Sequence, residues 1–462
     1  MMNETICAIS TAPGIGGIAV IRVSGTNAFP ICDQLFQAKH EGKKLCTQKA
    51  YTLLYGTISY NGEIVDDVMA AVFRSPHSFT GEDTVEISCH GSVYIQQQIL
   101  QLLLQLGCRL AKPGEFTQRA FMNGKMDLSQ AEAVADLIAS TSSGQHRLAM
   151  NQMRGGFSSE LKALREKLVY ITSLMELELD FADHEELEFA DRKELKDIAA
   201  LIEQTMSKLA HSFKAGNAIK NGIPVAIIGE TNAGKSTLLN LLLNEDKAIV
   251  SDIHGTTRDV IEDTVNINDI MFRFIDTAGI RETHDTIEAL GIERSFQAIN
   301  RADIVLWVID HTEAEKQIAA LSDKVLPLCE GKKLLLILNK SDLKTSSTSI
   351  GLSGFPENTQ VVSLSAKYKE GLDNLQALLA EAAHLPALSS NDIIVTNVRH
   401  YEALTNALDA IHRVQEGLST ELPADLISQD LRECIFHLSD IIGEVTTDEV
   451  LGNIFKNFCI GK

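Results

Sequence analysis

The chain lacks the cysteine spacings that indicate metal binding or disulfide formation. Its eight cysteines stand apart, at positions 7, 32, 46, 89, 108, 329, 434 and 459, and none of them form a C-x-x-C pair. Scattered cysteines of this kind indicate reduced thiols in a reducing, cytoplasmic compartment rather than a disulfide framework or a zinc site.

Long apolar runs are also missing. No stretch approaches the roughly 18 apolar residues of a membrane-spanning helix, so the sequence predicts no membrane association. Residues 1–5 lack the basic and then apolar pattern of a signal peptide.

Positive charge is scarce. The 41 lysines and arginines are outnumbered by 62 aspartates and glutamates, which gives the 462 residues a formal net charge of −21. This balance argues against a strongly basic protein that binds nucleic acid indiscriminately, although a local basic patch is enough to bind RNA. A chain of this length is expected to form about two to four domains.

One segment gives the clearest indication of function. Residues 229–236 read Gly-Glu-Thr-Asn-Ala-Gly-Lys-Ser and match the pattern G-x-x-x-x-G-K-[ST]. In such a loop, backbone N–H groups point at phosphate oxygens, Lys235 reaches the β- and γ-phosphates, and Ser236 binds Mg²⁺. The apolar run 223–228 predicts a buried strand before the loop, and residues 236–242 predict a helix after it.

Three further segments follow in the order that a GTP-binding domain requires. A strand-like run ends in Asp276-Thr277-Ala278-Gly279, whose aspartate can hold the Mg²⁺ shell and whose glycine N–H can reach the γ-phosphate. Another ends in Asn339-Lys340-Ser341-Asp342, and this last carboxylate can accept two N–H bonds that guanine offers and adenine does not. Ser365-Ala366-Lys367 would form the last wall of the base pocket. These segments predict GTP hydrolysis.

Two positions depart from the common small-GTPase pattern. Ile280 stands where Ras-like proteins carry the glutamine that orients the attacking water, so another polar group must do this. The nearby candidates are Arg281, Glu282, Asp285 and Glu288. Inside the loop, Asn232 is either a tolerated turn residue or a ligand for a monovalent cation that neutralises charge in the transition state.

The periodicity of apolar residues divides the chain into four predicted parts. Residues 1–120 mix strand-like runs with one clear helix, which is an α+β pattern. Residues 121–216 and 383–462 are helical, and strand–helix alternation occupies residues 217–382. The fold class is therefore multidomain α/β and α+β. A Ras-like P-loop G domain, with a mostly parallel sheet and helices on both faces, is inserted into a helical domain.

Three local features of the helical parts bear on function. Asp127 and Gln130 form a plausible capping box at the start of a helix. The acidic stretch 183–188 is either a solvated loop or a metal site. The last residues, 458–462, are either a frayed tail or the place of a reactive or redox thiol, Cys459.

Several blocks outside the nucleotide motifs are distinctive. They read TAPGIGG at 11–17, IRVSG at 21–25, SFTGED at 78–83, KPGEFT at 112–117, NGKMDL at 123–128, GTTRD at 255–259 and CIGK at 459–462. In these blocks the chain resembles the MnmE (TrmE) family of tRNA-modification GTPases, and the resemblance extends along its whole length. The GTTRD block occurs in several related GTPases, whereas the amino-terminal blocks and CIGK are more specific.

The resemblance implies GTP hydrolysis that is stimulated by K⁺ and needs no external arginine finger. The K⁺ ligands would be Asn232, Ser251, Ile253 and Thr256, and the Mg²⁺ ligands Ser236 and Thr257. Glu288 would orient the attacking water, and Lys235 would stabilise the transferred phosphate. The residues expected to bind the nucleotide are Gly229, Asn232, Ala233, Gly234, Lys235, Ser236, Thr237, Ser251, Thr256, Thr257, Asp276, Thr277, Ala278, Gly279, Asn339, Lys340, Asp342, Ser365, Ala366 and Lys367.

The resemblance also implies a tetrahydrofolate one-carbon derivative bound to the amino-terminal domain, through which the chain would dimerise. The matching positions are Arg22, Glu86, Lys125 and Lys462. Cationic side chains suit the glutamate carboxylates of folate, and Glu86 can accept N–H bonds from the pterin.

Family members act with the FAD-dependent flavoprotein MnmG, as a heterotetramer that contains a homodimer of the GTPase. Together they add an aminomethyl or carboxymethylaminomethyl group to C5 of the wobble uridine, U34, of certain tRNAs. By this resemblance Cys459 either contacts uracil C6 or the one-carbon unit, or has a structural role.

A second class of function stays open from the sequence. A switch-type GTPase that assembles ribosomes or other RNA would share the block at 255–259 but have no modification chemistry. Such proteins usually carry a basic RNA-binding module, which is not evident in a chain with a net charge of −21. We therefore favour the tRNA-modifying GTPase, and binding of a reduced folate would discriminate between the two.

Overall fold

The chain forms two compact units in the computed structural model. The structure describes residues 4–180, 192–246, 263–275, 296–343, 354–383, 393–420, 422–456 and 458–461. The first unit comprises Met1–Ala139, Ala149–Ser207 and Glu402–Lys462, and the second comprises Ser140–Leu148 and Lys208–Tyr401. Within the described residues, no helix has the length and hydropathy needed to cross a membrane.

The first unit begins with a seven-stranded sheet in the order β3-β4-β5-β6-β2-β1-β7. Its strands are β1 (Ile6–Ile9), β2 (Gly16–Ser24), β3 (Phe36–Ala38), β4 (Thr52–Tyr60), β5 (Glu63–Phe73), β6 (Thr84–Gly91) and β7 (Arg109–Leu110). Neighbouring strands are antiparallel, except for β1 and β7, which are parallel.

One face of this sheet carries the core. Along β2, Ala19, Ile21 and Val23 are buried and alternate with more exposed side chains, as expected for a strand with one covered face. Helices α1 (Ala28–Leu35) and α2 (Val93–Gln105) contribute buried side chains to the same hydrophobic cluster. The predicted α+β fold of this region is confirmed.

The rest of the first unit is helical. Its elements are α3 (Glu115–Met122), α4 (Leu128–Ala139), α6 (Gly156–Asp180), α14 (Ala424–Ile442) and α15 (Asp448–Lys456), together with the end of α5 (Ser143–Met153), most of α13 (Val398–Ser419) and the first half of α7 (Arg192–Asn221). The predicted capping box is present before α4. Asp127 N–H donates to Gln130 Oε1 at 2.9 Å, and Gln130 N–H donates to Asp127 Oδ1 at 3.0 Å.

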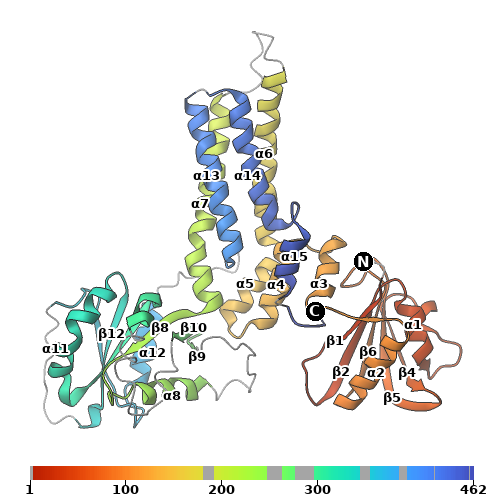
Figure 1. Ribbon diagram of the computed structural model, residues 1–462, viewed down its shortest axis with the longest axis horizontal. Helices are drawn as coiled ribbons and strands as arrows, with labels where there is room; N and C mark the ends of the chain where they lie inside the picture. The colour runs from red at the N-terminus through yellow and green to blue at the C-terminus, as the bar shows by residue number, and fades with distance from the viewer. Residues whose placement is uncertain are drawn as a thin grey trace. The chain divides into compact units, whose positions relative to one another are not determined.

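Ion pairs join the long helices, which lie alongside one another in Figure 1. Arg432 on α14 bonds Glu176 on α6 at 2.6 Å. Arg413 on α13 bonds Asp430 and Glu433 on α14, each at 2.7 Å. These pairs are exposed and contribute little individually, so the buried apolar side chains between the helices supply most of the packing energy.

The end of the described chain lies against the amino-terminal sheet. Ser10 Oγ donates to the Gly461 carbonyl at 3.1 Å, and Gly114 N–H donates to the Cys459 carbonyl at 3.3 Å. Gly461 has a φ of +93°, and a Cβ there would lie 2.3 Å from the Ile9 carbonyl oxygen. Residues 458–461 are therefore seated on the sheet rather than frayed.

The second unit contains a six-stranded sheet in the order β13-β12-β11-β8-β10-β9. Its strands are β8 (Ile223–Ile228), β9 (Asp263–Ile267), β10 (Ile270–Ile275), β11 (Ile304–Asp310), β12 (Lys333–Asn339) and β13 (Gln360–Ser363). All pairs are parallel except β9 with β10, an antiparallel hairpin that the sequence did not predict.

Helices cover both faces of this sheet. Val225 and Ile227 of β8 pack in one cluster with α8 (Lys235–Asp246) and α12 (Leu372–Ala382). The alternate residues, Ala226 and Ile228, pack on the other face with α11 (Ala314–Val325). A strand buried on both sides needs the continuous apolar run that the sequence shows, so the predicted Ras-like α/β domain is confirmed.

We expect Gly461→Ala to unseat residues 458–461 without unfolding the sheet. The added methyl group would contact the Ile9 carbonyl, and the left-handed backbone disfavours alanine. The Gly114 amide, which donates to Cys459, should then exchange its hydrogen about tenfold faster or more. The Ala111 amide, which donates to Cys7, is the internal control and should not change. Equal exchange at Gly114 in both proteins would contradict this seat.

Candidate functional site

The loop after β8 has the backbone of a phosphate-binding loop. Gly229, Asn232 and Gly234 have φ angles of +145°, +64° and +96°. A Cβ at Gly229 would lie 2.1 Å from the Val308 carbonyl oxygen, and one at Gly234 would lie 2.0 Å from Asn339 Nδ2. Glycine is therefore required at both positions. Asparagine tolerates the left-handed region, so the backbone at Asn232 fits either role considered for it.

Lys235 holds its ammonium over this loop. Its Nζ donates to the carbonyl oxygens of Gly229, at 2.9 Å, and Glu230, at 2.8 Å. Burial lowers the pKa of Lys235, because the charged form loses solvation. Lys235 is also the first residue of α8, whose N-terminus favours negative charge. The site therefore has a positive electrostatic potential, which favours the binding of phosphate oxygens.

Asn339, the last residue of β12, links three of the predicted motifs. Its Nδ2 donates to the Ala233 carbonyl in the phosphate loop at 2.8 Å. Its Oδ1 accepts the Ala366 N–H at 3.0 Å, from the segment after β13. Asn339 is only 3% exposed, so both bonds are shielded from water. The phosphate loop and the base pocket are thus joined through one amide side chain.

The remaining base-pocket residues are held by their neighbours. Asp342 Oδ1 accepts a hydrogen bond from Ser365 Oγ at 2.6 Å, which leaves Oδ2 available to a base. Lys340 Nζ lies 2.6 Å from Asp310 Oδ2. Partial burial opposes ionisation of Asp310, but hydrogen bonds from Lys340 and Thr312 outweigh it and lower its pKa. Asp310 ends β11 and was not predicted; its place after a buried strand was the available signal.

The described part of the predicted nucleotide site therefore gathers at the carboxyl ends of β8, β12 and β13. The residues placed there are Gly229, Asn232, Ala233, Gly234, Lys235, Ser236, Thr237, Asn339, Lys340, Asp342, Ser365, Ala366 and Lys367. Other predicted residues lie outside the described part of the chain: Ser251, Ile253, Thr256, Thr257, Asp276, Thr277, Ala278, Gly279, Glu288 and Lys462. The acidic stretch 183–188 and position 280 also lie outside it.

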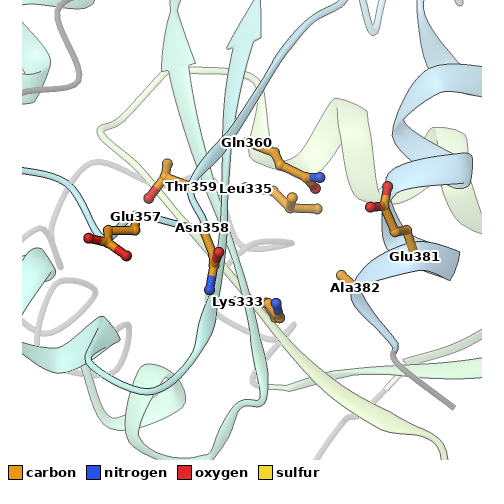
Figure 2. Close-up of a pocket in the computed structure, with 8 residues that line it drawn as sticks. All are labelled: Lys333, Leu335, Glu357, Asn358, Thr359, Gln360, Glu381 and Ala382. Atoms are coloured by element: carbon orange, nitrogen blue, oxygen red, sulfur yellow. The ribbon is translucent and has the colours of Figure 1, made fainter.

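A cavity of about 370 Å³ in the same domain is not part of this site. It is lined by Lys333, Leu335, Glu357, Asn358, Thr359, Gln360, Glu381 and Ala382, as Figure 2 shows. Lys333 and Gln360 are the first residues of β12 and β13. The cavity therefore lies at the opposite strand ends from the phosphate loop, whereas ligands of open α/β sheets bind at the carboxyl ends.

Two of the predicted folate residues form an ion pair on the amino-terminal sheet. Arg22 on β2 is paired in register with Glu86 on β6, and their side chains lie 2.8 Å apart. The guanidinium also lies 5.3 Å from the ring centroid of Phe79 and 5.5 Å from that of Phe116. The pair offers donors and an acceptor beside two aromatic rings.

Lys125 lies near the same segment as Phe79. Its Nζ donates to the Pro76 carbonyl at 3.0 Å, and Asn123 Nδ2 donates to the Thr80 carbonyl at 2.7 Å. The segment 76–80, which contains Phe79, therefore lies against Lys125 at Pro76 and beside Arg22 at Phe79.

A largely buried ion network, which the sequence did not predict as such, supports this region. Arg119 bonds Glu82 at 3.0 Å and Glu115 at 3.0 Å, and Arg109 also bonds Glu115. Glu82 in turn accepts a bond from Ser24 at the end of β2, at 2.8 Å. Four of these residues fall in or beside the blocks at 78–83 and 112–117. These distinctive blocks therefore contain residues that hold the domain together.

Cys459 differs from most cysteines of the chain in its exposure. Cys459 and Cys46 are exposed, whereas the other six are buried. Burial raises the pKa of Cys89 to about 11 and that of Cys434 to about 12, which makes these thiols unreactive. Cys459 is accessible and lies on a backbone that is fixed at Gly461.

A phosphate loop at the end of β8, together with an Asn-Lys-x-Asp segment at the end of β12 of a mostly parallel sheet, defines a GTP hydrolase of the P-loop class. The family described as "MnmE helical domain" matches residues 128–459, and "GTP-binding protein TrmE N-terminus" matches residues 5–125. The chain belongs to the MnmE family.

Curated relatives agree over the full length. A protein of Parabacteroides distasonis named tRNA modification GTPase MnmE is 69% identical over 461 residues, covering 99% of this chain and 100% of that protein. A protein of Bacteroides thetaiotaomicron with the same name is 63% identical over 468 residues, covering 100% of both. The resemblance seen in the sequence is confirmed.

We expect Asn339→Ala to weaken guanine-nucleotide binding by about tenfold to a hundredfold. The change removes the bond to the Ala233 carbonyl and leaves the buried Ala366 N–H unsatisfied, at a cost of about 1–3 kcal/mol. Stopped-flow dissociation of a fluorescent GDP analogue should show faster release. Asn358→Ala, on an exposed asparagine that lines the cavity of Figure 2, is the matched control. Unchanged release from the Asn339 variant would show that the bridge does not support the site.

Proposed function

We propose that this GTPase modifies C5 of the wobble uridine, U34, in certain tRNAs, and that GTP turnover is required for the modification. The observation that carries the proposal is the combination, in one chain, of a phosphate loop joined to a guanine-base pocket with the amino-terminal domain of the MnmE family. The curated relatives are named for tRNA modification, which supports the same assignment.

In the GTPase domain, Lys235, Asp342 and Asn339 have distinct roles in this proposal. Lys235 binds the β- and γ-phosphates, exchanging its two carbonyl partners for phosphate oxygens. Asp342 accepts the guanine N–H groups, and Ser365 fixes the orientation of its carboxylate. Asn339 keeps the phosphate loop and the base pocket at a constant separation.

Two cations complete the site in the proposal. Ser236, together with Thr257, would hold Mg²⁺, and Asn232 with Ser251, Ile253 and Thr256 would hold K⁺. Hydroxyl, amide and carbonyl oxygens are ligands that such hard cations prefer, and Ser236 directly follows the phosphate-loop lysine. When bound, these ions neutralise charge on the phosphates, as an arginine finger does in other GTPases. Glu288 would orient the water in place of the missing glutamine.

For the amino-terminal domain we propose a tetrahydrofolate one-carbon carrier held by Arg22, Glu86, Lys125 and Lys462. The Arg22–Glu86 pair can donate to and accept from a pterin at once, and Phe79 and Phe116 offer apolar surface beside it. Because Glu86 already offsets the charge of Arg22, the proposal assigns the glutamate carboxylates to Lys125 and Lys462.

The remaining proposals concern partners. A homodimer formed through the amino-terminal domain would act in the cytoplasm with the FAD-dependent flavoprotein MnmG, as a heterotetramer that binds tRNA. Cys459 would act near the one-carbon unit or the uracil ring. Its exposure and the seating of residues 458–461 on the folate-binding domain support a role there.

We expect Arg22→Gln to weaken binding of 5-formyltetrahydrofolate by about tenfold or more. Glutamine cannot reproduce the charged bond to Glu86, so both groups that are proposed to bind the pterin, at positions 22 and 86, are disturbed. Isothermal titration calorimetry of the whole chain measures this directly. Arg147→Gln removes an exposed arginine on α5 and should bind the folate as the wild type does. Equal affinities for the wild type and Arg22→Gln would exclude Arg22 from the folate site.

The function itself is tested by nucleoside mass spectrometry of tRNA from cells that lack the gene. The C5-substituted wobble uridine should disappear and should return with the wild-type gene but not with Lys235→Ala, which removes the phosphate-binding ammonium. Unchanged tRNA accompanied by a ribosome-assembly defect would sink the proposal and favour a switch-type GTPase.

A further inference from the structure

The loop between β3 and β4 gathers positive charge on a chain that is otherwise acidic. Between residues 39 and 49, four lysines accompany one glutamate, whereas the whole chain carries a net charge of −21. Lys39, Lys43, Lys44 and Lys49 are all exposed. Lys39 lies 3.4 Å from Asp67, but no carboxylate among the described residues pairs with the other three lysines. These three ammonium groups are therefore available to an anionic partner.

Two exposed tyrosine rings border the lysines. The Tyr51 side chain is 71% exposed and that of Tyr55 is 50% exposed. The Tyr51 ring stands edge-on to Phe73, with 6.1 Å between centroids. The backbone of Tyr51 has a φ of +61°, in the left-handed region that bulky residues rarely adopt. The fold thus holds an exposed aromatic ring in position despite backbone strain.

The loop that carries the lysines is anchored to the domain. Asp33 accepts the N–H groups of Leu45, at 2.6 Å, and Cys46, at 3.0 Å. Arg74 donates to the Gln48 carbonyl at 2.8 Å, and the Leu45 side chain is fully buried. A surface that is already ordered loses less conformational entropy when a partner binds.

The strand register places the start of β4, which directly follows this loop, in line with Arg22 and Glu86. Leu53, near the start of β4, is paired with Ala71 of β5. Ala71 is paired in turn with Glu86, which is the partner of Arg22. Neighbouring strands lie about 4.8 Å apart, so three steps across the sheet place the start of β4 about 14 Å from Arg22.

We propose that Lys43, Lys44, Lys49 and Tyr51 bind the anticodon loop of the tRNA substrate. The lysines contact phosphates, and the Tyr51 ring stacks on an unpaired base, which single-stranded loops offer and duplexes do not. A stacked strand advances roughly 3.4 Å per nucleotide, so about 14 Å corresponds to about four nucleotides. An anticodon loop held at the start of β4 can therefore extend its wobble base toward the Arg22–Glu86 pair. The inference rests on the proposed tRNA modification.

Edge protection is a simpler explanation for the lysines alone. Lysines at an edge strand such as β3 discourage pairing with another sheet, and β3 ends this sheet. That explanation accounts for the charge but not for an exposed, strained tyrosine held beside it. Phosphates and bases together match both features.

Binding of a fluorescein-labelled anticodon stem-loop RNA with uridine at position 34 tests the proposal. Fluorescence anisotropy with the whole chain is measured over a range of salt concentrations. Replacing Lys43, Lys44 and Lys49 together by glutamine should reduce the slope of log affinity against log salt by about 2. Tyr51→Ala should weaken binding by about tenfold with an unchanged salt slope, and Tyr51→Phe should retain the wild-type affinity.

The matched control replaces three exposed lysines on helices α7 and α11, Lys196, Lys316 and Lys324, by glutamine. This gives the same change in net charge. It should leave RNA affinity unaltered. Equal losses in both triple variants would overturn the proposal, because net charge alone would then explain them. A loss of the homodimer in the Lys43/Lys44/Lys49 variant, measured by analytical ultracentrifugation, would also overturn it and identify the surface as a contact between two copies.

Nucleoside mass spectrometry in cells separates this proposal from the one on which it rests. If the wild-type gene restores the wobble modification and the Lys43/Lys44/Lys49 variant does not, the surface is required. If both restore it fully, the surface is not the tRNA site although the proposed function holds. If the wild-type gene does not restore it, the proposed function itself fails.

Discussion

Burial on both faces of the parallel strands is the constraint on which the nucleotide site depends. Alternate side chains of β8 pack into different clusters, one with α8 and α12 and one with α11. Each strand is therefore fixed in register and length, and its carboxyl end is fixed with it. The phosphate loop, Asn339 and the segment after β13 meet at that edge because the buried strands β8 and β12 and the edge strand β13 end there. The single Asn339 amide can then connect them, since the strands hold its two partners within hydrogen-bond distance.

The amino-terminal sheet follows a different rule. Helices α1 and α2 cover one face, so buried and more exposed side chains alternate along β2, β5 and β6, and Arg22 and Glu86 stand at positions outside that core. Arg22, Glu86 and the start of β4 share one row across the strands. The ion network of Arg119 and Glu115 fixes the segments on which Phe79 and Phe116 stand. This domain therefore arranges polar groups by strand register, whereas the GTPase domain arranges them at strand ends.

Local patterns in the sequence were sufficient for the class of both folds and for much of the site. Three segments can be identified without coordinates, because the contacts they make to phosphate or base require particular residue types. They are the phosphate loop, the Asn-Lys-x-Asp segment and Ser365-Ala366-Lys367. The same is true of the Asp127–Gln130 capping box, whose partners are three residues apart. By contrast, Asp310 was missed, because its partner Lys340 lies 30 residues away, and a position at the end of a buried strand does not by itself identify that partner. The β9–β10 hairpin was also missed, although its two-residue turn, Asn268-Asp269, with positive φ at both residues, is a local hairpin signal.

The sequence by itself therefore determined the nucleotide chemistry, the family and the alternation of strands and helices, because these depend on residue type and short spacing. The tertiary structure decided which distant groups meet. It paired Arg22 with Glu86, 64 residues apart, and seated Gly461 against Ile9. It also aligned the start of β4, which follows the lysine-bearing loop, with the Arg22–Glu86 pair across a single sheet. Strand order and register set these distances, and they result from the packing of the whole domain rather than from any local run of residues.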